Sequence, residues 1–139
     1  MAYLALAILN SLFFASLALI HLNWLLGGSF GSHLLIPTDG NNRLLYKPNG
    51  AKAAVLCAGF LLFILVNLTR TGILPESTVE PMSRYGVAAI GLLLLLRAIG
   101  DFAYVGFSKR FYNSRFAYTD SWIFSPVCLV MAIFHFALL

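Results

Sequence analysis

Apolar stretches alternate with short polar segments along the chain, and they predict four membrane-spanning helices at about residues 3–28, 51–70, 83–107 and 121–139. A helix that crosses a bilayer needs about 20 mostly apolar residues, which each stretch supplies. Pro48, Asn49 and Gly50 form a turn before the second helix, and Gly72 and Pro75 end it. We therefore expect one all-α domain over residues 1–139, an integral membrane bundle of four transmembrane helices.

The start of the fourth helix has two interpretations. With Asp120 as N-cap and Ser121 as first residue, the helix is about 28 Å long and Pro126 kinks it after the first turn. With Ser125 as cap and Pro126 as first helical residue, it is about 21 Å long, and residues 121–124 lie along the membrane interface. We favour the first, because the apolar core of a bilayer is about 30 Å thick.

A pair of opposite charges interrupts the third apolar stretch. Arg97 and Asp101 are four residues apart within residues 86–107. Each charge costs about 2.5–3.5 kcal/mol at the bilayer centre, which nearly cancels the gain from the apolar residues around it. We therefore expect Arg97 and Asp101 to pair with each other and to face protein or trapped water.

Helical spacing brings further polar residues to the same depth. Tyr104 continues the stripe of Arg97 and Asp101, and His21 and Trp24 lie near the corresponding end of the first helix. We predict a polar pocket in the cytoplasmic half of the bundle, lined by His21, Trp24, Arg97, Asp101, Tyr104, Asp120 and Ser125. Structural roles are the alternative: a charged pair that locks its helix, a hydrogen-bonded interior histidine and a capping aspartate. We expect no catalytic residue, metal ligand or cofactor.

The fourth helix carries a seam of small and polar residues at helical spacing, which permits close contact with a neighbouring helix. Its members are Ser121, Ser125, Cys128, Ala132 and His135. Cys57 and Cys128 have no disulfide-framework or zinc-site spacing, so we interpret both as packing residues.

Composition and charge place the chain in the cell membrane. Hydrophobic residues make up 60% of it and charged residues 10%, which is typical of a multi-pass membrane protein. Six Lys and Arg residues lie in or beside the loops at 29–50 and 108–120: Arg43, Lys47, Lys52, Lys109, Arg110 and Arg115. The remaining loop has only two basic residues beside it, Arg70 and Arg84. This bias predicts that both loops are cytoplasmic and both termini outside. The expected partners are the lipid bilayer and a second copy or a larger membrane complex, and not nucleic acid.

Four parts of the sequence carry a resemblance to a known family: residues 21–28 (HLNWLLGG), residues 97–107 (RAIGDFAYVGF), Phe116 and Ala117 with Asp120, and residues 125–129 (SPVCL). Together they resemble the bacterial family of small four-helix integral membrane proteins called domain of unknown function 3995. The resemblance implies the four-helix fold and its topology. The family has no assigned activity.

Three classes of function remain open. In the first, which we favour, a structural or interaction protein uses the polar cluster to fix its bundle. In the second, a transporter or channel for a small solute, an ion or protons acts as an oligomer, with His21, Arg97 and Asp101 as a relay. In the third, a membrane enzyme binds a lipid or quinone, with His21 or Asp101 as base and Arg97 binding an anionic head group.

Overall fold

The computed structural model describes residues 2–71 and 80–139, and over these residues the fold is all-α. The long helices are α1 (Ala2–Leu25), α3 (Gly50–Thr69) and α4 (Glu80–Ile99). The short helix α2 (Ser32–Leu35) lies between α1 and α3. A continuous helical run over Arg115–Ala137 follows α4. It consists of α5 (Arg115–Thr119), a π-helical turn η1 (Asp120–Phe124) and α6 (Ser125–Ala137).

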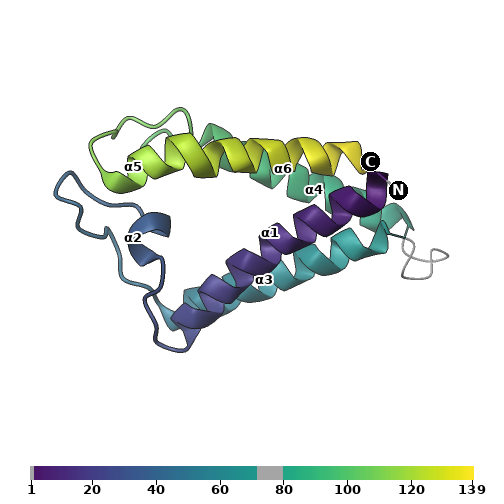
Figure 1. Ribbon diagram of the computed structural model, residues 1–139, viewed down its shortest axis with the longest axis horizontal. Helices are drawn as coiled ribbons and strands as arrows, with labels where there is room; N and C mark the ends of the chain where they lie inside the picture. The colour runs from purple at the N-terminus through teal and green to yellow at the C-terminus, as the bar shows by residue number, and fades with distance from the viewer. Residues whose placement is uncertain (1, 72–79) are drawn as a thin grey trace.

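These helices pack as two antiparallel pairs, α1 with α3 and α4 with α6 (Figure 1). The pairs meet near the N- and C-termini, which we call the terminal end, where α3 also contacts α4 and α1 also contacts α6. They diverge toward the opposite end, which carries α2, α5 and the connecting loops and which we call the loop end (Figure 1). Both termini therefore lie at the same end of the bundle.

Small residues and aromatic rings in edge-to-face contact form the core between the pairs. The Phe14 ring lies 5.2 Å from the Phe63 ring and 5.7 Å from the His135 ring, between centroids. The seam predicted on the last helix is buried at Ser125, Cys128, Ala132 and His135. At Gly91 of α4 the fit to α6 is close, because an added Cβ would lie 3.2 Å from the Cβ of His135.

The outer surface of the bundle is apolar. Leu19 is 66% exposed and Val55 72% exposed, and many other large apolar side chains are exposed with them. Among the described residues, three helical segments are long and apolar enough to cross a membrane: Tyr3–Leu25, Gly50–Thr69 and Arg115–Ala137. The protein is thus a multi-span membrane protein. Because α4 is not among those three, a fourth span stays a prediction.

The predicted end of the third long helix was wrong. Instead of continuing to residue 107, α4 ends at Ile99. Gly100 follows with φ +102°, a left-handed conformation that glycine adopts readily and that terminates helices. The first helix also ends earlier than predicted, at Leu25 instead of residue 28.

Neither interpretation of the fourth helix matches its observed start. The helical run begins at Arg115, where the Ser114 hydroxyl accepts the Ala117 backbone N–H at 3.1 Å. Asp120 therefore lies inside the run and is not its N-cap. The wide π turn precedes Pro126, which has no N–H and whose ring would collide with the preceding turn of a regular α-helix.

Candidate functional site

The most buried charged group of the loop end is Asp120, whose residue exposure is 0%. Its carboxylate lies between two cations. Asp120 Oδ1 accepts a hydrogen bond from Arg97 Nη2 at 2.6 Å, and Oδ2 accepts one from Lys109 Nζ at 2.8 Å. The Lys109 side chain is itself 0% exposed. A buried carboxylate requires such partners, because removing an unpaired charge from water is very unfavourable.

Uncharged donors complete the environment of this carboxylate. Oδ2 also accepts the Gly106 backbone N–H at 2.7 Å and the Ser125 hydroxyl at 3.3 Å. Lys109 Nζ donates a further bond to the Gly106 carbonyl at 2.9 Å. We call these residues, Arg97, Gly106, Lys109, Asp120 and Ser125, the Asp120 cluster. It connects α4, the loop after α4, η1 and α6.

A compact loop brings Gly106 and Lys109 to Asp120. Gly100 and Gly106 lie against each other, and a Cβ on either would overlap backbone atoms of the other. After this contact the chain returns to α4, where the Phe107 N–H donates to the Ala98 carbonyl at 2.9 Å and the Ser108 N–H donates to the Ile99 carbonyl at 3.0 Å. The two glycines therefore allow the reversal that aims the Gly106 N–H at Asp120.

Asp101 organises the same loop from its other side. Its Oδ1 accepts the backbone N–H groups of Ala103, Tyr104 and Val105 at 2.9, 2.8 and 2.9 Å. Desolvation acts to raise the pKa of this carboxyl, but the three hydrogen bonds outweigh it and hold the pKa below its usual range. Asp101 thus stabilises the loop in its charged form.

The predicted pairing of Arg97 with Asp101 was wrong. The helix ends between them, so the four-residue spacing no longer places both side chains on one helical face. Arg97 pairs with Asp120 instead, and Asp101 binds loop backbone. Among the described residues, no ion pair joins Arg97 and Asp101.

His21 and Trp24 lie in an aromatic group near the loop end of α1. The His21 ring centroid is 4.7 Å from that of Trp24 and 5.2 Å from that of Phe60. His21 Nδ1 lies 2.8 Å from the Leu17 carbonyl oxygen, which can only accept, so Nδ1 carries the proton in this contact. Trp24 Nε1 donates to the Phe30 carbonyl at 2.7 Å.

A cavity of about 680 Å³ lies between the two helix pairs. His21, Trp24 and Arg97 line it together, and Lys47, Asn49 and Lys52 add polar groups to the same wall. Deeper residues are apolar and mainly aromatic, among them Phe13, Phe14, Phe60 and Phe63. Its volume falls in the range of small-molecule sites, about 300–1,000 Å³.

The structure thus divides the predicted pocket residues into separate groups. Arg97, Asp120 and Ser125 meet in the Asp120 cluster, and Arg97 shares the cavity wall with His21 and Trp24. Tyr104 stacks on Phe111 at 4.8 Å in the loop, and neither it nor Asp101 lines the cavity. Within residues 2–71 and 80–139, no group of three His, Cys, Asp or Glu side chains is placed to hold a metal ion.

Sequence reasoning missed Gly106 and Lys109. Lys109 precedes Arg110 in a polar segment, where a lysine is ordinarily solvated, and nothing in its neighbours signals burial. Gly100 directly after the basic last turn of α4 was a usable signal, because a glycine in that place often ends a helix.

Comparison with known proteins gives one match. No curated protein and no solved structure matches the chain significantly. The model of one family matches residues 14–135, which include the Asp120 cluster and nearly all of the cavity wall. On this match, the chain belongs to the family described as "Protein of unknown function (DUF3995)".

Proposed function

We propose that this protein is a four-span membrane protein that binds an amphiphilic, lipid-soluble ligand in the cavity between its two helix pairs. The cavity is the observation that carries the proposal. In this proposal the Asp120 cluster is structural, since it holds the loop after α4 against α6 at one end of that cavity.

The fourth span is supported by length and by position. With 20 residues, α4 is about 30 Å long, which equals the thickness of the apolar core of a bilayer. Both termini lie at the same end of the bundle, as an even number of spans requires (Figure 1).

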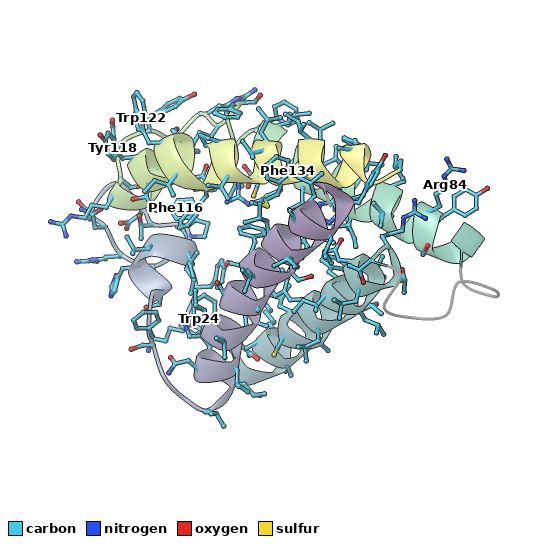
Figure 2. All side chains as sticks on the ribbon, turned by 45° about the vertical axis from the view of Figure 1, so that its right-hand side comes forward. Trp24, Arg84, Phe116, Tyr118, Trp122 and Phe134 are labelled. Carbon is cyan, nitrogen blue, oxygen red and sulfur yellow. The ribbon has the colours of Figure 1, made fainter. Side chains whose placement is uncertain are left out.

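Exposed aromatic side chains support the same placement of the bundle. Tyr3 and Tyr85 at the terminal end are 61% and 78% exposed. At the loop end, Tyr118 and Trp122 are 68% and 71% exposed and lie on the outer side of α5 and η1 (Figure 2). Tyrosine and tryptophan favour the two membrane interfaces, so both ends of the bundle carry suitable anchors.

The loop end is proposed to face the cytoplasm. Lys109 is buried and does not count as a loop charge, but five exposed cations remain at this end: Arg43, Lys47, Lys52, Arg110 and Arg115. Arg70 and Arg84 lie at the terminal end, where they donate to the backbone carbonyls of Leu138 and Leu139. The bias of Lys and Arg toward the cytoplasm then places both termini outside. Alkaline phosphatase fused to the C-terminus should be active, and an inactive fusion would reverse the orientation.

The shape and lining of the cavity suit an amphiphile. From Phe13 to Trp24 on α1, the wall extends about 16 Å at 1.5 Å per residue. This is about half of the 30 Å apolar core, the depth of one leaflet. The deep aromatic wall suits an apolar chain, and the polar residues at the loop end suit a head group at the interface.

A pair of leucines on α1 tests the proposal. Leu17 lines the cavity, whereas Leu19 does not line it and is 66% exposed. We expect the wild-type protein, purified in mild detergent, to retain lipid that native mass spectrometry detects. Leu17→Trp should abolish this retention by filling the cavity, and Leu19→Trp should preserve it. A wild-type protein without bound lipid, or equal retention by both variants, would contradict the proposal.

A further inference from the structure

We infer that the ligand of the cavity is an anionic amphiphile whose phosphate or carboxylate head binds Arg97, with Lys47 and Lys52 beside it. This inference rests on the proposed function and adds the charge of the ligand. It starts from Arg97, whose guanidinium group is shared between the Asp120 cluster and the cavity wall.

The guanidinium group of Arg97 is only partly used within the protein. Nη2 donates to Asp120, but Nη1 is buried and has no hydrogen-bond partner among the described residues. Buried polar atoms in native proteins are nearly always satisfied, so the guanidinium group keeps hydrogen-bonding capacity that no described protein group uses. The planar group binds carboxylate and phosphate oxygens with two parallel hydrogen bonds, which makes these groups its preferred acceptors.

The formal charges point to the same ligand. Arg97 and Lys109 share one carboxylate, Asp120, so the cluster carries one positive charge in excess. Lys47 and Lys52 add two further cations to the cavity wall, and no Asp or Glu lines that wall among the described residues. A cavity wall with several cations and no carboxylate favours an anion and disfavours a cation.

Two neighbouring groups could in principle neutralise Arg97, and the structure uses neither. Asp101 lines an adjacent hollow with Arg97, but its Oδ1 is occupied by three backbone N–H groups. Tyr46 also lines the cavity, and desolvation raises the pKa of its hydroxyl despite the opposing effect of Arg97. Tyr46 therefore stays uncharged at neutral pH and offers a donor to the head group.

The position of Arg97 along α4 matches the depth of a lipid head group. Arg97 lies two residues before the end of α4 at Ile99, so its guanidinium lies at the loop end. The apolar part of the cavity continues from there toward Phe14. With the loop end in the cytoplasm, the ligand comes from the cytoplasmic leaflet, where anionic lipids gather.

The test measures which lipids the purified protein binds. Wild-type protein is stripped of lipid in a neutral detergent and titrated with phosphatidylglycerol, oleate or phosphatidylcholine, and native mass spectrometry counts the bound molecules. We expect phosphatidylglycerol or oleate to bind at least about ten-fold more tightly than phosphatidylcholine, because hydrogen bonds between charged partners are the strong ones. Comparison of the affinities for phosphatidylglycerol and oleate shows whether the site prefers a phosphate or a carboxylate head group.

Variants locate the effect without removing the fold. Arg97→Lys keeps a cation for Asp120 but loses the second nitrogen, and Lys47→Gln with Lys52→Gln removes the other cations of the wall. Both should lose most of the preference for the anionic lipid. The matched control, Arg43→Gln with Arg115→Gln, removes two exposed loop-end cations that do not line the cavity. This control should keep the preference for the anionic lipid.

The outcomes separate this inference from the proposed function. Equal binding of phosphatidylcholine and phosphatidylglycerol by the wild-type protein would overturn the anion site while leaving a lipid-binding cavity. An equal loss in the matched control would also overturn it, since general surface charge would then explain the preference. If no lipid binds at all, both proposals fail.

Discussion

Replacing Asp120 should destabilise the protein, because this carboxylate is the shared acceptor of the Asp120 cluster. Asp120→Asn preserves the shape of the side chain and one amide oxygen, which can still accept the Gly106 N–H. It removes the charge that Arg97 and Lys109 face at 2.6 and 2.8 Å, and directs an amide donor at one of them. Lys109, with 0% side-chain exposure, then has no carboxylate partner and no water.

The expected loss follows from the burial of the partners. Removing one member of a buried ion pair costs about 3–5 kcal/mol, mostly because the remaining charge is stranded. Arg97 contributes less of this cost, because its side chain is 34% exposed and water can reach it. We therefore expect Asp120→Asn to lower the free energy of unfolding by about 3–5 kcal/mol.

Unfolding in sodium dodecyl sulfate, followed by the fluorescence of Trp24 and Trp122, measures this loss. Asp101→Asn is the matched comparison and should cost less than Asp120→Asn, because Asp101 is exposed and an amide oxygen can still accept the loop N–H groups. The double variant Asp120→Leu/Lys109→Met should be more stable than Asp120→Leu alone, since no buried lysine is left unpaired. The reasoning is refuted if Asp120→Asn unfolds like the wild type, or if Lys109→Met gives no rescue.

Three further perturbations test the packing and the loop, each by the same unfolding measurement. Gly91→Leu should destabilise the protein by about 1–3 kcal/mol through overpacking between α4 and α6, whereas Gly59→Leu, with nothing within 4 Å, should not. Gly100→Ala should cost about 2–5 kcal/mol because of its positive φ and its contact with the loop backbone, and Gly40→Ala, in open space, should be neutral. Because the folded pKa of Asp101 is lowered, its charged form stabilises the fold above the unfolded-state pKa, and this contribution disappears as the pH falls through the folded value. Asp101→Asn should therefore reduce the loss of stability in acid, and an unchanged acid profile would contradict this role.

The apolar pattern was sufficient to predict the main helices and one packing face. Asn49 precedes α3 and accepts the Ala51 N–H at 2.9 Å, as a turn and cap before a helix should. The seam on α6 is buried as its spacing predicts, at Ser125, Cys128, Ala132 and His135. Both features are local, because they depend only on helical periodicity and on residues next to the helix start.

The end of α4 shows where periodicity misleads. Phe102, Ala103, Val105 and Phe107 prolong the apolar pattern beyond Gly100, so composition alone extends the helix through them. In the structure they belong to the loop that returns to α4, and Phe102 itself has a φ of +61°. The burial of Lys109 depends on this return of the chain. It brings Lys109 into contact with Asp120, which is 11 residues further along the sequence. No helical or strand period encodes such a contact.

Arg97 shows that a structural and a ligand-binding role need not exclude each other. A pair of Arg97 with Asp101 would use the charge of Arg97 within one helix, and a structural role would then exclude a binding role. Its actual partner Asp120 is shared with Lys109, and only Nη2 is engaged there. A residue that lines the cavity, is held by one nitrogen and does not use all its donors within the protein is preorganised to bind. The variant that distinguishes the two roles is therefore Arg97→Lys: it should keep most of the stability that Asp120→Asn removes, and lose the preference for an anionic lipid.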